Sequence, residues 1–171
     1  MSGYDIRKEV ATSIGYFWSE SFGQIYPALR DLTARGFIKR RAGAGPRERH
    51  VYEITARGRE ALREWQAAPP RSAPARNELL LKLFFGAPGR VRHEVSWLQQ
   101  LQDEESSSLR AFRSIRRQLL SEQRDHPSLP FWLATVSYGE HRSRAVLRWA
   151  RETLTTLRGL QRRAAKKDTA R

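Results

Sequence analysis

Residues 67–74, with the sequence AAPPRSAP, limit what this chain can fold into more than any other stretch. Three of these eight residues are proline. Proline has no backbone N–H to donate, and it biases the residue before it toward extended conformations, so no helix is expected to cross the segment. The sequence therefore predicts two domains, at 1–66 and 77–171, joined by a proline-rich linker at 67–76.

The composition excludes several classes of protein. The chain contains no cysteine, so it can form neither disulfides nor thiolate metal sites. No stretch approaches the ~18 consecutive apolar residues of a transmembrane helix, and the first ten residues lack the features of a secretory signal peptide. A cytoplasmic protein with no membrane partner is expected.

The net charge of +14 indicates a polyanionic partner, most often nucleic acid. The alternative is a coding bias, because 27 of the 32 basic residues are arginine. The charge is spread along the chain, with local concentrations at 35–49 and 158–171. We interpret the first as a candidate DNA-binding element and the second mainly as a solvated helix end.

The first domain is predicted to combine three helices with one β-hairpin. The expected elements are helices at 4–13 and 21–35, strands at 37–41 and 49–55, and a helix at 56–65. Apolar residues recur every three or four positions in the second helix, and Gly36 follows it where a left-handed residue is expected. Thr55 is placed to cap the last helix. This order is typical of a winged helix-turn-helix after its first helix.

The second domain is predicted to be helical throughout, with helices at 77–85, 90–124 and 131–163. Residues 102–108 contain no apolar side chain, so this part of the longest helix is expected to face solvent or to bend. The two long helices carry narrow apolar stripes that a domain of this size cannot bury by itself. A second copy of the chain is expected to cover them, which makes the region a dimerisation arm.

The exposed face of the helix at 21–35 carries small and amide side chains. Glutamine can pair with adenine in the major groove, and backbone N–H groups at a helix N-terminus can bind phosphate. The residues predicted to face bases or the groove wall are Ser21, Gln24, Tyr26 and Pro27. The alternative is an ordinary solvated helix face.

The predicted hairpin places positive charge beside that helix. An arginine-rich hairpin containing glycine can straddle phosphates or enter the minor groove. The residues predicted to make such contacts are Arg30, Lys39, Arg41, Arg47 and Arg49. The alternative is that this charge serves only solubility.

Several motifs together resemble the PadR family of bacterial transcriptional regulators. They are GYDI at 3–6, GQIYPAL at 23–29, the RGF junction at 35–37, and YEIT at 52–55 followed by Gly58. Residues 78–85, ELLLKLFF, and the late Trp149 are similar to the C-terminal helical region of the family. The resemblance implies a dimeric winged-helix repressor that places the helix containing YPAL in the DNA groove of a palindromic operator.

The resemblance also implies an effector, since some members of the family bind phenolic or planar aromatic compounds between the C-terminal helices of the dimer. The candidate lining residues are Trp97, Phe112, Trp132 and Trp149, because aromatic faces stack on such ligands. The alternative role for these side chains is to fill the dimer core.

One departure from the family pattern concerns the hydrophobic helix that normally precedes the GYDI motif, because the chain begins two residues before this motif. Part of the apolar face formed by Ile6, Val10, Ile25 and Leu29 is therefore expected to lack a cover. Our hypothesis is that Met1 is an internal residue of a longer protein, which peptide mapping of the native protein would test.

No arrangement of residues typical of an enzyme is found in the sequence. The four histidines lack metal-binding spacing, and neither a nucleophile motif nor a complete phosphate-binding loop is present. We expect no catalysis, no metal and no cofactor. The main alternative to a DNA-binding regulator is a dimeric protein-interaction module that kept the fold and lost specific DNA binding.

Overall fold

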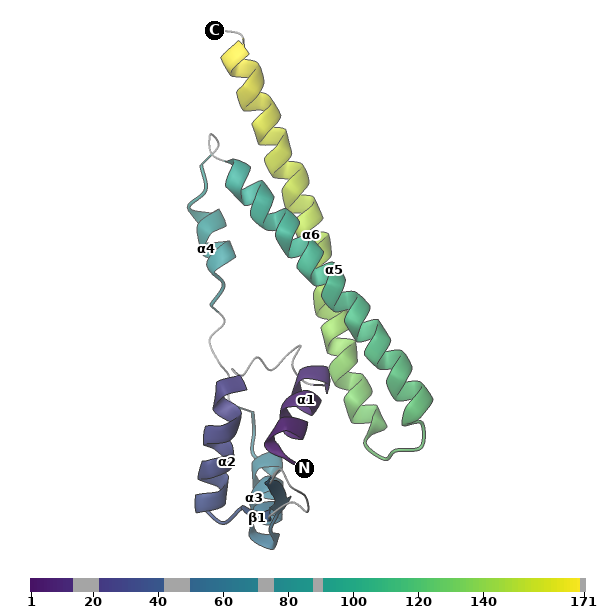
Figure 1. The fold of residues 1–171 in the computed structure, drawn as a ribbon. Helices are drawn as coiled ribbons and strands as arrows, with labels where there is room; N and C mark the ends of the chain where they lie inside the picture. The colour runs from purple at the N-terminus through teal and green to yellow at the C-terminus, as the bar shows by residue number, and fades with distance from the viewer. Residues whose placement is uncertain (14–21, 42–49, 71–75, 88–90, 170–171) are drawn as a thin grey trace. The chain divides into compact units, whose positions relative to one another are not determined.

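The computed structural model describes residues 1–13, 22–41, 50–70, 76–87 and 91–169 (Figure 1). The chain forms two compact units, Met1–Ala73 and Pro74–Arg171. The boundary between them falls within the proline-rich segment.

Within its described residues, the first unit combines helices with an antiparallel hairpin. Its elements are α1 (Gly3–Ser13), the short 3-10 helix η1 (Phe22–Gln24), α2 (Ile25–Ala34), β1 (Ile38–Arg41), β2 (Val51–Ile54) and α3 (Ala56–Ala67). The hairpin pairs Ile38 with Ile54 and Arg41 with Val51. This mostly helical architecture with a small hairpin confirms the predicted fold class.

The side chain of Thr55 holds the junction between α2, the hairpin and α3. Its Oγ1 accepts a hydrogen bond from the Gly58 N–H at 3.0 Å and so caps α3, as predicted. The same hydroxyl donates toward the carbonyl oxygens of Gly36 at 2.8 Å and Phe37 at 3.1 Å. Gly36 has a φ of 71°, the left-handed conformation expected just after α2. Turn chemistry that can be identified in the sequence thus determines how α3 joins the hairpin.

The first two residues add a short pairing to the edge of β2. Ser2 forms a β-bridge with Val51, and the Tyr52 N–H donates to the Met1 carbonyl oxygen at 2.9 Å. Ser2 also caps α1, because its Oγ accepts a hydrogen bond from the Asp5 N–H, while the Asp5 carboxylate accepts hydrogen bonds from the Ser2 N–H and hydroxyl. α1 therefore begins directly beside the hairpin.

The second unit is built on two long helices that run in opposite directions and cross (Figure 1). Its elements are α4 (Glu78–Phe84), α5 (Val91–Glu122) and α6 (Leu129–Thr169). Leu79 and Leu83 of α4 pack against a core cluster of Leu98, Ala150 and Leu154. No helix in the described ranges is long and apolar enough to cross a bilayer.

The prediction for residues 102–108 was wrong at Glu105. α5 continues through this stretch, and Glu105 is only 6% exposed because it lies against α6. Its carboxylate accepts a hydrogen bond from the Ser143 hydroxyl at 2.7 Å and pairs with Arg142 at 3.2 Å. A buried carboxylate is tolerated only where such partners replace water, so a polar stretch in the sequence became part of the helix contact.

A second buried carboxylate, Glu140, lies farther along the same contact and is also 6% exposed. Arg116 donates to one of its oxygens at 2.9 Å from α5, and Arg144 donates to the other at 2.8 Å from within α6. Burial raises the pKa of Glu140, but the hydrogen bonds and charges of the two arginines outweigh it, so the pKa lies below its ordinary value.

Glu140 should therefore contribute to stability in a pH-dependent way. Its folded-state pKa is depressed, so its contribution is present above the ordinary value of 4.5 and is lost as the pH falls through the lower folded value. We expect Glu140→Gln to flatten the loss of stability on acidification, measured by urea unfolding between about pH 3 and pH 6. The matched control is Glu122→Gln, which removes an exposed carboxylate of α5. Parallel curves for Glu140→Gln and wild type would contradict the expectation.

Candidate nucleic-acid interface

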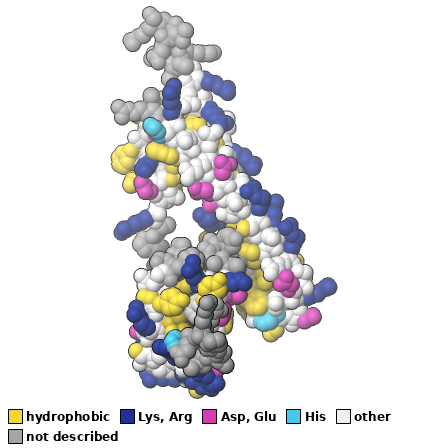
Figure 2. All heavy atoms as spheres, in the orientation of Figure 1, with side chains coloured by type: hydrophobic (Ala, Val, Ile, Leu, Met, Phe, Trp, Pro, Cys, Tyr) yellow, Lys and Arg dark blue, Asp and Glu magenta, His cyan; other side chains and the backbone are white. Residues whose placement is uncertain are grey.

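Positive charge is distributed widely over the surface. Figure 2 shows Lys and Arg side chains on both units, with no single basic patch on the visible face. The net charge therefore does not locate a DNA-binding site by itself. The site has to be located from the geometry of individual helices and strands.

α2 buries one side and exposes the other. Leu29 is buried and Ile25 is half-buried, as the apolar spacing predicts. Gln24, Pro27 and Arg30 are exposed. Gln24 occupies the N-cap position, yet its side chain makes no capping hydrogen bond. Its amide is therefore not committed to closing the helix and can serve a ligand.

The Tyr26 side chain lies between the buried and the exposed side of α2. A Cβ atom added at Gly3 would come within 2.8 Å of Tyr26 Cε1, so the tyrosine ring packs closely on the start of α1. Tyr26 nevertheless remains 54% exposed. It therefore helps to pack α1 against α2 while part of the ring stays accessible.

The two predicted contact residues of β1 share one acidic neighbour. Lys39 Nζ lies 3.5 Å and Arg41 Nε lies 3.2 Å from the same oxygen of Glu53 on β2. These side chains are exposed, so water weakens the pairing. Arg40 was not among the predicted contacts, and it hydrogen-bonds to His50. With three basic residues against one acid, the paired strands keep a positive charge.

The remaining predicted contacts are Ser21, Arg47 and Arg49, which lie outside the described residues. All the predicted contact residues that the structure describes belong to the first unit, where α2 and β1 are neighbours. The exposed face of α2 and the basic strand are thus parts of one compact body.

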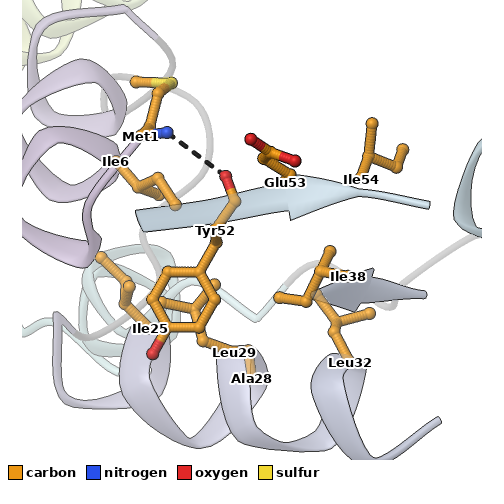
Figure 3. Close-up of a pocket in the computed structure, with 10 residues that line it drawn as sticks. All are labelled: Met1, Ile6, Ile25, Ala28, Leu29, Leu32, Ile38, Tyr52, Glu53 and Ile54. Carbon is orange, nitrogen blue, oxygen red and sulfur yellow. Dashed lines mark hydrogen bonds between the residues drawn. The ribbon is translucent and has the colours of Figure 1, made fainter. Parts of the chain in front are cut away.

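An apolar pocket opens between α1, α2 and the hairpin, with a volume of about 370 Å³ (Figure 3). Ile6, Ile25 and Leu29 line it, and these are three of the four residues predicted to lack a cover. Figure 3 shows Tyr52 closing the hairpin side, where the N-terminal amine of Met1 donates to the Tyr52 carbonyl oxygen at 3.3 Å.

Two of the four aromatic residues predicted to line an effector site lie within the helix packing. Phe112 is 4% exposed, and its ring covers Gly139 of α6 so closely that a Cβ there would overlap it. Trp149 packs, partly buried, against the core cluster at α4. Phe112 therefore contributes to the contact between α5 and α6, and Trp149 contributes to the core of the second unit.

The other two aromatic residues are partly buried and lie on different helices. Trp132, near the start of α6, stacks on His126 with 4.4 Å between ring centroids. Trp97 of α5 forms part of an open pocket between α4 and α5. Among the described residues, the structure does not gather the four aromatic side chains around one cavity.

A half-buried helix with an exposed polar face, a basic hairpin beside it and a capped helix after it define a winged-helix domain, a class that binds DNA. Two family models match the chain: the transcriptional regulator PadR-like family at residues 1–64, and the virulence activator alpha C-terminal family at residues 75–158. Residues 1–64 of the chain belong to the PadR-like family of transcriptional regulators. Proteins of this family are regulators and not enzymes.

Two curated relatives support this membership. The negative transcriptional regulator PadR of Bacillus subtilis is 36% identical over 88 residues, which are 50% of this chain and 48% of that protein. The match therefore spans about half the length of that relative. A probable transcriptional regulator of Mycobacterium tuberculosis is 28% identical over 133 residues, covering 71% of this chain and 70% of that protein.

Solved structures share the fold over most of the chain. Bacillus subtilis PadR in complex with operator DNA has a TM-score of 0.74 at 25% identity, covering 91% of this chain and 90% of that one. The same protein in complex with p-coumaric acid has a TM-score of 0.69 at 23% identity, covering 92% and 90%. The Vibrio cholerae virulence activator AphA has a TM-score of 0.73 at 27% identity, covering 93% and 90%.

Proposed function

We propose that the chain is a dimeric DNA-binding regulator that represses transcription from a palindromic operator. The exposed face of α2 carries this proposal, because the Gln24 amide is uncommitted at the start of the helix. A glutamine amide can bind adenine by two hydrogen bonds, whereas Arg30 and Lys39 suit phosphates. The complex of Bacillus subtilis PadR with operator DNA supports this function for the present chain.

Dimerisation is supported by the outer side of α4. Four apolar side chains there are between 49% and 81% exposed: Leu80, Leu81, Phe84 and Phe85. Exposed apolar side chains that lie next to one another mark an interaction surface. In a two-fold dimer, the two α2 helices would face half-sites about 10 bp apart, which requires a palindromic operator.

Relief of repression by a small aromatic or phenolic effector is the third part of the proposal. The structure of Bacillus subtilis PadR in complex with p-coumaric acid supports it. Trp97 is the best placed of the four predicted residues, because it lines an open pocket. Phe112 is the least accessible of them, since it is buried against α6.

The apolar pocket of the first unit favours a second candidate function. A cavity of about 370 Å³ beside Ile25 and Leu29 leaves α2 without packing on part of its inner side. A dimeric protein-interaction module that kept the fold and lost specific DNA binding would tolerate such a gap, and an apolar partner segment would fill it.

Fluorescence anisotropy with DNA from upstream of the gene distinguishes the two functions. The titration is made at about 0.15 M salt with excess competitor DNA, since electrostatic binding alone is independent of sequence. We expect saturable binding that survives the competitor, by a species with twice the chain mass of 19.8 kDa in light scattering. Binding that disappears with competitor would favour the interaction module.

Replacing Gln24 with alanine should relax the preference for one base pair of the operator. Loss of a two-point contact to a base costs about 1–3 kcal/mol of discrimination. The measurement is the ranking of single-base operator variants by anisotropy, with Gln99→Ala, an exposed glutamine of α5, as the control. An unchanged ranking would show that Gln24 does not contact a base.

A further inference from the structure

α6 carries a straight row of arginines along one exposed side. Positions 144, 148, 151, 155, 158 and 162 follow one another at alternating steps of four and three residues, which places them on a single stripe of the helix. All six side chains are exposed, and all except Thr155 are arginine. The α6 row consists of Arg144, Arg148, Arg151, Arg158 and Arg162.

Most of the charge in the α6 row lacks a counter-ion. Arg144 pairs with Glu140 at 2.8 Å, and within the described ranges the other four arginines form no ion pair. Glu152 is the one acidic residue between positions 144 and 162, and in the described structure it is not paired with the row. The row is therefore a line of nearly uncompensated positive charge.

α5 adds a second row beside the first. Arg116 of α5 and Arg144 of α6 donate to the two oxygens of the same carboxylate, that of Glu140. The α5 arginines in the same turns as Arg116 therefore lie on the side of the helix pair that carries the α6 row. Three of these are exposed and form no ion pair among the described residues, and they make up the α5 row: Arg110, Arg113 and Arg117. We call the two rows together the arginine face.

α4 packs against the opposite side of α5. Glu104 of α5 lines the space between these two helices, and Arg113 follows Glu104 by nine residues. Because each residue turns an α-helix by about 100°, Arg113 points away from α4. The exposed apolar side chains of α4 that support dimerisation thus lie on the other flank of α5. A dimer formed through them leaves the arginine face open to a partner.

The chemistry of the arginine face favours one kind of polyanion. Neither row contains an apolar or aromatic side chain, and the exposed large apolar residues of α5 and α6 lie in the half of the pair nearer to its loop: Leu120, Phe131 and Tyr138. Membrane surfaces and protein partners require apolar anchors beside the charges, and single-stranded nucleic acid requires rings on which bases stack. Duplex DNA requires none of these, since its phosphates form a straight, dense line of negative charge.

We propose that the arginine face of α5 and α6 binds the phosphate backbone of duplex DNA without regard to base sequence. The guanidinium group matches phosphate geometry with two parallel hydrogen bonds. The α6 row spans about 27 Å at 1.5 Å per residue, which corresponds to roughly eight base pairs. This surface extends the proposed DNA-binding function, but it does not depend on base recognition by α2.

The salt dependence of binding by the full chain tests the proposal. Anisotropy is measured with a 30-bp duplex of arbitrary sequence between about 0.05 and 0.3 M salt. Each phosphate contact contributes about 0.9 to the slope of log affinity against log salt. Combining Arg148→Gln with Arg151→Gln should therefore flatten the slope by about two units and weaken binding at 0.1 M salt by about tenfold or more.

Two further double variants control for net charge and for the fold. Arg76→Gln with Arg163→Gln removes the same charge from exposed positions outside both rows, since Arg163 points about 100° away from Arg162, and should flatten the slope by less than about one unit. Arg148→Lys with Arg151→Lys keeps the charge and should retain most of the slope. Urea unfolding should be the same for all these variants, because the four arginines are exposed.

Each other outcome overturns the proposal. Equal flattening by the two glutamine variants would show a general effect of net charge, and an unchanged slope would show that the arginine face does not touch DNA. The same comparison is made with a single strand and with vesicles containing phosphatidylglycerol. A larger effect of the row substitutions on either of these would assign the face to a different partner.

The proposal and the operator-binding function fail separately. Substitutions in the α6 row should leave the ranking of single-base operator variants unchanged, whereas Gln24→Ala should change that ranking and leave most of the salt slope intact. Failure to bind an operator specifically would not alter the slope measured with arbitrary duplex.

Discussion

Replacing Gly58 with alanine is expected to destabilise the first unit strongly. Gly58 lies buried in α3, where an added Cβ would overlap the Phe37 carbonyl oxygen and come within 2.9 Å of Ile54 Cγ1. The carbonyl cannot simply move away, because it also accepts hydrogen bonds from the backbone N–H and the hydroxyl of Thr55. We expect a loss of about 3 kcal/mol or more, against a gain in helix propensity of about 1 kcal/mol.

Hydrogen exchange with segment resolution measures this effect in the intact chain. A loss of 3 kcal/mol corresponds to amide exchange about 100-fold faster in α2, β2 and α3, while α5 and α6 should be unchanged. Operator binding should fall with the folded fraction. Gly36→Ala is the control, since its site has open space and only a left-handed backbone, which costs about 1 kcal/mol. If amide exchange is accelerated equally in the two variants, close packing is not the reason why position 58 requires glycine.

Replacing Gly139 with alanine should destabilise the second unit by about 2 kcal/mol, after allowing for the helix propensity that alanine adds. The new Cβ would overlap the Phe112 ring, which is 4% exposed and has no open side to move into. Among the described glycines of α5 and α6, Gly139 is the one at which the two helices approach each other most closely.

Urea unfolding followed by far-UV circular dichroism reports on this unit, since α5 and α6 supply most of the helix. Gly159→Ala is the matched control in the same helix, where nothing lies within 4 Å of an added Cβ, and it should stabilise the protein by up to about 1 kcal/mol. Combining Gly139→Ala with Phe112→Leu should restore part of the loss. Equal effects of the two glycine substitutions would rule out the Phe112 contact as the cause.

Features that depend on neighbouring residues were predictable from the sequence. The left-handed Gly36 and the Thr55 cap follow from local turn chemistry, and the apolar spacing of α2 correctly predicted that Leu29 is buried. The resemblance identified the family, and apolar spacing and charge identified the residues of α2 and β1 that are exposed in one unit. Their contacts with DNA stay predictions.

Features that depend on distant residues were not predictable. Glu105 looked like part of a solvated turn, because its partner Ser143 lies 38 residues away and no periodicity links them. The role of Phe112 stayed open between an effector site and the helix core, because the sequence does not show that Gly139 lies beneath its ring. The pocket at Trp97 also depends on distance, since Lys82 comes from another helix.

Thr55 fixes the start of α3 relative to the end of α2. One hydroxyl binds the N–H of Gly58 and the carbonyl oxygens of Gly36 and Phe37, so the end of α2 is tied to the start of α3. The other end of α3 continues directly into the proline-rich segment that leads to the second unit. Because of these bonds, the start of α3 and the end of α2 are expected to move together.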